Sequence, residues 1–265
     1  MTRVSGRKLI ASPCCHTLYA MTSYMSVNYS SFAFWTDGKR DGSLMPNDSG
    51  LRKCQCGNYF LQSEAVKLEI PAGDDREFAP HVHTSDLKHA IATATSEKVE
   101  LAARRDYWMH LNDSYRKKYC THRDAEDAQT DANWENEWSR ENPDDRSIFK
   151  KLIDKFRRIK LQRPPINPNR PFTFPAFQPT TEQVENMERI IELLLSSTER
   201  LHLEYPIELA ELYRELGKFD TAIKLINGIK DEDQDRLSRL LLELAIEKTT
   251  APIRYRGCRN RKKND

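Results

Sequence analysis

The chain has 265 residues, of which 38% are apolar and 31% charged, a polar balance that still supplies modest cores. Lys and Arg number 42 against 40 Asp and Glu, which excludes a global positive field, so binding to nucleic acid or an anionic membrane requires a local basic patch. No stretch reaches the roughly 18 uninterrupted apolar residues of a membrane span, and no signal-peptide core follows the first residues. We therefore expect about two domains in a cytoplasmic protein with no membrane span.

Residues 1–70 have the composition of a small β-rich module. Tyr, Phe, Ser and Thr are frequent in this region, and turn signals such as Asp37-Gly38 divide it into short stretches. Strand-type sequences are found at 18–24, 31–35 and 59–61. The region therefore predicts several short strands connected by turns.

Four of the six cysteines occur in two short groups, Cys14-Cys15 and Cys54-Gln55-Cys56. In a reducing compartment, clustered thiols indicate a metal site more strongly than a disulfide bond. Structural zinc takes four ligands in a tetrahedron, and two distant knuckles supply them when strands bring the knuckles together. We predict a structural Zn²⁺ site with the ligands Cys14, Cys15, Cys54 and Cys56, in which His16 is an alternative to either neighbouring cysteine. Packing of these thiols without metal and a redox or catalytic use are the other interpretations.

The same region resembles a known group of proteins. Pro13-Cys14-Cys15, Trp35-Thr36-Asp37-Gly38 and the run from Cys54 to Phe60 are similar to the zinc-ribbon segment of uncharacterised bacterial proteins. In that group a C-P-x-C knuckle precedes a W-[ST]-D-G turn, and an aromatic residue follows the second knuckle. Ser12 and Lys53 stand where the pattern has cysteines. The resemblance implies a zinc-ribbon-like module and brings no activity with it.

A helical segment is predicted over 84–120. Asp86 opens a short helix, and Ser96 has the residue type that caps the start of the next one. In that second helix, apolar and aromatic residues share one stripe: Leu101, Trp108, Leu111 and Tyr115. We interpret this stripe as core.

The middle of the chain is charged and then rich in proline. Segment 121–163 is acidic at first, and Asn142-Pro143 begins a predicted basic amphipathic helix. Such a helix suits a membrane surface or a partner's groove, but we favour a packed helix whose charges face water. Six prolines between positions 164 and 180 exclude a helix interior and predict an extended linker.

Residues 181–248 are predicted to form a helical hairpin region, and 249–265 form a basic tail. The helices are expected at 181–196, 207–216, 219–229 and 235–248. The run from Leu209 to Ala222 is similar to the middle of one tetratricopeptide repeat, in which Ala210 and Ala222 allow close helix packing and Gly217 makes the turn. A single copy predicts a helical hairpin and does not define a peptide-binding array.

Local motifs of common catalytic sites are absent from the sequence, which has no G-x-x-x-x-G-K-[ST], G-x-S-x-G or H-E-x-x-H. His81, His83 and His89 lack a carboxylate at the spacing of a known metalloenzyme motif. An enzyme site assembled by the fold from dispersed residues stays open.

The sequence therefore predicts an α+β protein, with a small β-rich zinc-ribbon-like N-terminal module followed by a mainly α-helical region. The leading functional hypothesis is a non-enzymatic protein-interaction or scaffold protein with a structural zinc site and a protein partner. The alternative is a nucleic-acid-binding zinc-ribbon protein that uses the basic segments 150–163 and 254–263.

Overall fold

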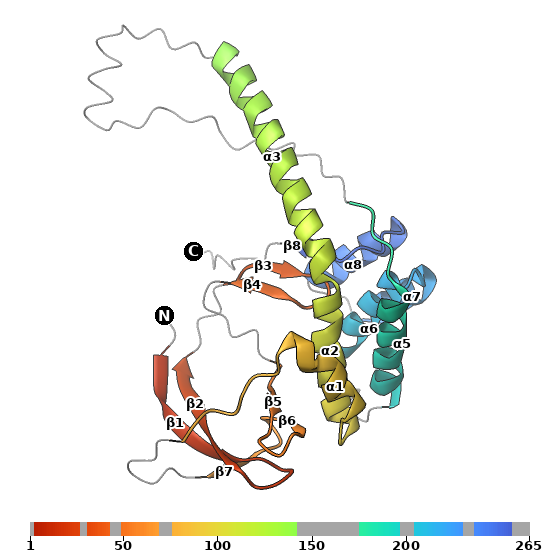
Figure 1. Ribbon diagram of the computed structural model, residues 1–265. Helices are drawn as coiled ribbons and strands as arrows, with labels where there is room; N and C mark the ends of the chain where they lie inside the picture. The colour runs from red at the N-terminus through yellow and green to blue at the C-terminus, as the bar shows by residue number, and fades with distance from the viewer. Residues whose placement is uncertain are drawn as a thin grey trace, which may run out of the picture. The chain divides into compact units, whose positions relative to one another are not determined.

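The structure is a computed structural model, and it describes residues 3–26, 31–42, 49–68, 76–141, 175–196, 204–229 and 236–255. The chain divides into two compact units, one made of residues 1–113 and 177–265 and the other of 114–176. Short strands precede a mainly helical region, so the predicted α+β class is confirmed (Figure 1). Among the described residues, no helix has both the length and the apolar character that crossing a bilayer requires.

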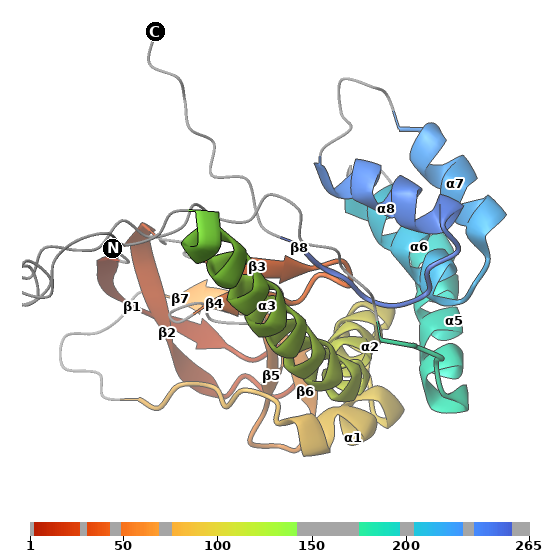
Figure 2. The same cartoon turned by 90° about the horizontal axis from the view of Figure 1, so that it is seen from above.

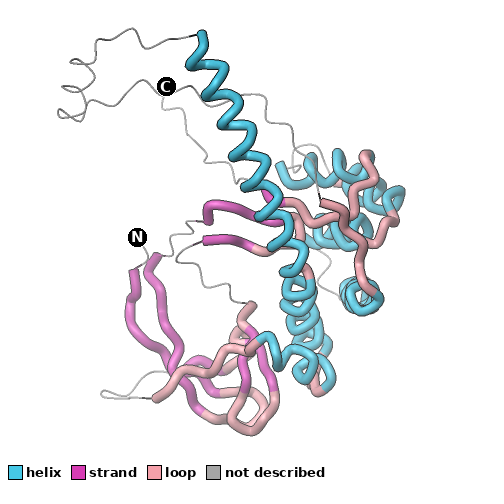
Figure 3. The backbone as a smooth tube through the Cα atoms, turned by 45° about the horizontal axis from the view of Figure 1, so that its top comes forward, coloured by secondary structure: helices cyan, strands magenta, loops and turns pink. Residues whose placement is uncertain are grey.

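The first sheet of the larger unit is an antiparallel hairpin with a third, short strand on one edge (Figure 3). Strand β1 (Arg3–Ala11) pairs with β2 (Leu18–Ser26), and the last pair before the connecting loop joins Ala11 to Leu18. Strand β7 (Val66–Leu68) pairs with the other edge of β1. The hairpin therefore holds the loop of residues 12–17 at its tip.

Both faces of a second hairpin are buried, and successive side chains of each strand point to opposite faces. Strand β5 (Leu51–Lys53) pairs with β6 (Tyr59–Leu61). Leu51 and Tyr59 join a core formed with the first helices, whereas Phe60 joins a core with residues of the first sheet. This small hairpin therefore connects the β-rich and helical parts of the unit.

The third sheet brings together distant parts of the sequence. Strand β3 (Ser31–Trp35) pairs with β4 (Arg40–Gly42) on one side and with β8 (Arg254–Tyr255) on the other. The turn between β3 and β4 needs a residue in the left-handed backbone conformation, and Gly38 adopts it with a φ of 85°. The amide of Gly38 donates to the carbonyl of Trp35 at 3.0 Å, which closes the turn.

The predicted helical segment after residue 84 forms a 3-10 turn, η1 (Thr84–Asp86), and two helices, α1 (Leu87–Ala92) and α2 (Glu97–Leu111). Ser96 caps α2 as predicted, because its side chain accepts a hydrogen bond from the amide of Val99 at 3.3 Å. The predicted aromatic stripe is divided by a helix boundary. Helix α2 ends at Leu111, and α3 (Asp113–Glu141) begins after Asn112.

Among the described residues of the larger unit, four helices follow (Figure 2). They are α5 (Thr181–Ser196), α6 (Glu204–Glu215), α7 (Phe219–Asn227) and α8 (Arg236–Ile246). Ala210 and Ala222 are completely buried in the core that α6, α7 and α8 share. Gly217 has a φ of 73° and ends α6, and the amide of Lys218 donates to the carbonyl of Tyr213 at 2.8 Å. The predicted helical hairpin is therefore present.

A buried polar network connects the turn after β3 to the helices. Asn112 donates through Nδ2 to Asp37 Oδ2 at 3.0 Å and to Glu215 Oε2 at 3.3 Å. Trp108 Nε1 donates to the same Glu215 oxygen at 3.0 Å, and Gln183 Nε2 donates to Asn112 Oδ1 at 2.9 Å. These side chains are at most 5% exposed, and their hydrogen bonds satisfy most of their polar atoms, whereas Glu215 Oε1 is buried with no partner among the described residues.

The described part of the smaller unit consists mainly of α3. Within it, the rings of Tyr115 and Tyr119 lie 6.2 Å apart between centroids with 58° between their planes, and the Tyr115 hydroxyl donates to the carbonyl of Pro175 at 3.4 Å. Several sequence predictions fall outside the described residues: the basic amphipathic helix at 142–163, the linker up to residue 174 and the tail from residue 256. The six-part division of the chain and the nucleic-acid alternative stay predictions.

Candidate metal centre

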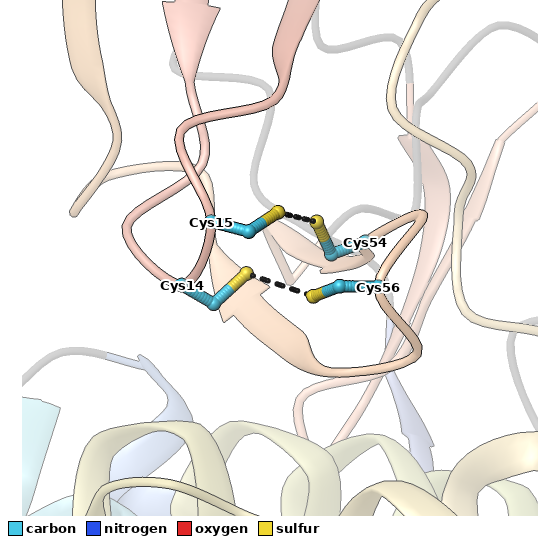
Figure 4. A group of neighbouring side chains, drawn as sticks. All are labelled: Cys14, Cys15, Cys54 and Cys56. Carbon is cyan, nitrogen blue, oxygen red and sulfur yellow. Dashed lines mark hydrogen bonds between the residues drawn. The ribbon is translucent and has the colours of Figure 1, made fainter.

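The first cysteine group lies in the loop between β1 and β2. The amide of Ser12 donates to the carbonyl of Thr17 at 2.9 Å, and the amide of His16 donates to the carbonyl of Ser12 at 3.0 Å. His16 adopts a φ of 60°, in the left-handed region, so the chain reverses direction within this loop. Neighbouring cysteines in an extended strand point in opposite directions, whereas this turn directs Cys14 and Cys15 to the same side (Figure 4).

The second cysteine group lies in the loop between β5 and β6. The amide of Cys54 donates to the carbonyl of Asn58 at 2.7 Å, and the amide of Gly57 donates to the carbonyl of Cys54 at 2.9 Å. Gly57 has a φ of 91°, which a residue with a side chain rarely adopts. This tight turn presents Cys54 and Cys56 toward the first loop (Figure 4).

The two loops bring four sulfur atoms together. Cys15 Sγ lies 3.3 Å from Cys54 Sγ, and Cys14 Sγ lies 3.5 Å from Cys56 Sγ. All four sulfurs lie within 4.8 Å of one another. A zinc ion bound to four thiolates at about 2.3 Å separates them by about 3.8 Å, the edge of the tetrahedron. The observed spacing therefore matches a four-thiolate metal site, and it exceeds the roughly 2.05 Å of a disulfide bond.

Three hydrogen bonds fix the distance between the loops. The segment before η1 bridges the two hairpins, since Ala20 of β2 donates its amide to Glu77 at 2.9 Å and Lys53 of β5 donates its amide to Pro80 at 3.0 Å. The hydroxyl of Tyr19 accepts the amide of Gln55 at 2.7 Å. The sulfur positions are thus fixed by backbone pairing on both sides of the site.

Hydroxyl groups surround the buried part of the cluster. Ser12 is completely buried, and its Oγ lies 3.6 Å from Cys15 Sγ and 3.5 Å from Cys54 Sγ. Thr17 Oγ1 lies 3.0 Å from Cys15 Sγ, and Tyr19 donates its hydroxyl hydrogen to Cys54 Sγ at 3.5 Å. The protonated Cys54 thiol donates to Ser12 Oγ, and once a sulfur has lost its proton these hydroxyl groups are placed to donate the hydrogen bonds that a thiolate favours.

The thiols differ in their acidity for local reasons. Hydrogen bonds from Thr17 and Ser12 lower the pKa of Cys15 to about 5. Burial opposes ionisation of Cys54, but hydrogen bonds from Ser12, the Cys56 amide and Tyr19 together lower its pKa. Burial and the neighbouring thiols raise the pKa of Cys14 to about 12. Metal binding at this cluster therefore includes the release of a proton from at least one thiol.

The predicted ligand set is brought together, and histidine is not part of it. Within the described ranges, the group of convergent donors contains the four cysteines, while His16 is exposed. The other candidate imidazoles have separate roles: His83 caps η1 through Ser85, and His89 Nδ1 lies 3.0 Å from the hydroxyl of Tyr59.

The hydroxyl groups around the sulfurs were missed at the sequence level. Ser12 and Thr17 flank the first knuckle, and this flanking position is the signal that points to them. Ser12 occupies the position of a cysteine in the C-P-x-C pattern, and its hydroxyl lies beside two sulfurs. Tyr19 carries no such signal, because its contact with Cys54 depends on how the two hairpins pack.

Comparison with known proteins gives no match: none of the protein-family models, curated proteins or solved structures searched is similar to this chain. The function is therefore argued from the site and the fold.

Proposed function

We propose that this chain is a non-enzymatic interaction or scaffold protein whose N-terminal module is stabilised by one zinc ion bound to Cys14, Cys15, Cys54 and Cys56. The observation that carries the proposal is the convergence of four sulfurs within 4.8 Å from two hairpin loops. Four protein thiolates fill a tetrahedral zinc site, and this leaves no position for water or substrate. Such a site supports a fold and performs no chemistry on a substrate.

The zinc ion has a clear structural task in this module. The core beside the site is small, since Ile10, Tyr19, Cys54 and Phe60 are its largest members. Neither loop belongs to a strand, so the ion would crosslink two hairpins that otherwise meet through few residues. Because an unfolded chain holds no preformed site, the free energy of metal binding contributes to folding.

The scaffold part of the proposal is supported by surface features of the first sheet. Strand β7 lies at the edge of that sheet, and Val66 and Leu68 on it are 57% and 41% exposed. An edge strand with exposed apolar side chains is suited to pairing with an extended segment of a partner. We expect the bound zinc to keep this sheet in the form that a partner recognises.

Metal content tests the zinc site directly. Untagged full-length protein, purified under reducing conditions, is analysed by elemental mass spectrometry beside Cys54→Ser, Cys56→Ser and Cys120→Ser variants. We expect one zinc per chain in the wild type and in Cys120→Ser, because Cys120 lies outside the cluster. The first two variants should lose it. Wild-type protein without zinc, or equal zinc in all the variants, would contradict the proposal.

The interaction surface needs its own test. Wild-type protein and a Val66→Lys, Leu68→Lys variant are immobilised and exposed to lysate, and captured proteins are identified by mass spectrometry. A Lys67→Ser variant on the same strand is the control. Partners that bind the wild type and the control but not the double variant support the edge strand as the surface, whereas identical recovery from all three rules it out.

A further inference from the structure

A second site lies in the larger unit, away from the cysteines. A cavity of about 630 Å³ opens between the β4-β3-β8 sheet and side chains of α2, α5, α6 and α8. Its volume is in the range of pockets that hold small organic ligands. Five aromatic residues contribute to its lining: Phe34, Trp35, Trp108, Tyr205 and Tyr255.

One wall of the cavity is a row of side chains across the three strands. Phe34 of β3 is paired with Arg40 of β4 and with Tyr255 of β8, so the three side chains lie on one face of the sheet. The rings of Phe34 and Tyr255 are stacked, with centroids 5.9 Å apart and 30° between their planes. The guanidinium of Arg40 lies 5.9 Å from the Phe34 centroid. The wall therefore offers an aromatic surface that ends in a cation.

Four charged side chains line the cavity: Asp37, Arg40, Arg105 and Glu208. Arg105 and Glu208 pair with each other through two hydrogen bonds of 2.6 and 2.5 Å. Asp37 is 4% exposed, and its two oxygens accept hydrogen bonds from the backbone amide of Lys39 and the side-chain amide of Asn112. Arg40 is exposed, and within the described part of the chain it makes no ion pair. The cavity is thus suited to a flat aromatic ligand with an anionic group beside Arg40.

We propose that this cavity binds a nucleoside monophosphate, with its base against the aromatic wall of Phe34 and Tyr255 and its phosphate at Arg40. Nucleotides combine a flat ring with an anionic group in a molecule of this size, and bases stack on aromatic side chains and arginine planes. This ligand site goes beyond the scaffold function and does not depend on the zinc ion.

Calorimetric titration of the full-length protein tests the proposal. AMP, GMP, CMP and UMP are titrated into wild type, Arg40→Gln and Arg7→Gln, and the matching nucleosides are titrated as ligands without phosphate. Arg7→Gln is the matched control, because its guanidinium lies over the Phe78 ring at 5.2 Å outside the cavity. Circular dichroism checks that each variant is folded.

We expect saturable binding of at least one monophosphate to the wild type and to Arg7→Gln. Binding to Arg40→Gln should be about tenfold weaker or more, since a charge-assisted contact is lost, and the nucleoside should bind the wild type and Arg40→Gln equally. Absence of binding by all four monophosphates overturns the proposal. Equal affinity of a monophosphate for Arg40→Gln and Arg7→Gln overturns it as well.

Discussion

Glu215 provides the sharpest test of the buried polar network. Its side chain is fully buried, and burial, followed by the nearby charges of Glu211 and Asp37, raises its pKa well above the ordinary value. Only one of its oxygens accepts hydrogen bonds from Trp108 and Asn112, while Oε1 is buried with no partner among the described residues. The folded protein therefore favours the protonated carboxyl.

The raised pKa makes the stability depend on pH in a defined direction. Above the unfolded pKa of about 4.3, the unfolded chain releases the Glu215 proton while the native state retains it. The free energy of unfolding then falls as pH rises, by up to about 1.4 kcal/mol per pH unit, until the folded pKa is passed. The Glu215→Gln variant cannot ionise, so it lacks this contribution.

Urea denaturation of both proteins at several pH values between 5 and 8, followed by circular dichroism, measures the effect. We expect the wild type to lose stability relative to Glu215→Gln as pH rises, and the comparison at each pH cancels the titration of groups that do not interact with Glu215. Glu192→Gln, an identical change at a side chain that is 65% exposed, is the control and should show no such trend. A stability difference between wild type and Glu215→Gln that is constant with pH would refute the reasoning.

Three further predictions concern local structure, each measured by urea denaturation. Ser96→Ala removes the cap of α2 and should cost about 1 kcal/mol, whereas no loss would mean that water replaces the cap. Ala222→Leu overfills the completely buried contact between α6 and α7 and should cost about 1 to 3 kcal/mol, while Leu at the exposed Thr221 should cost little. In Gly38→Ala the added methyl group meets no heavy atom within 4 Å, so the expected loss of about 1 to 2 kcal/mol in the free energy of unfolding comes from backbone strain alone. Gly228→Ala is the control, because Gly228 has a φ of −77° and alanine adopts it without that strain.

The sequence predicted most of the helices and some of the strands because their signals are local, but it ended the second helical segment at residue 120, whereas α3 continues to Glu141. Ser96 and Gly217 mark helix ends through their own chemistry, and α5 covers the same residues as predicted. Strands β1, β4, β5, β7 and β8 were not predicted. Four of these strands are only two or three residues long, and their partner strands, not their own composition, define them. The nine-residue β1 carries Gly6 and Lys8, residue types that are depleted in strands.

Much of the candidate site could also be predicted from the sequence. Clustered cysteines identify the ligand types, but whether Cys14 and Cys15 face the same ion depends on the turn that His16 makes with a φ of 60°. The contact between Tyr19 and Cys54 requires two hairpins to pack, and no local pattern encodes that. The nucleotide cavity was invisible because Phe34 and Tyr255 are far apart in sequence.

The pairing of β3 with β8 sets an order for folding during synthesis. Thr36 accepts a hydrogen bond from the amide of Ile253, a residue 217 positions later, so the third sheet cannot close before the ribosome has made that strand. The strands of the two cysteine hairpins and the segment that bridges them lie before residue 82, and the core that Leu51 and Tyr59 share with α1 and α2 is complete by residue 111. Chains generally fold from the N-terminus as they emerge. The nascent chain therefore contains everything that the four-cysteine cluster needs long before the third sheet and the cavity beside it can form.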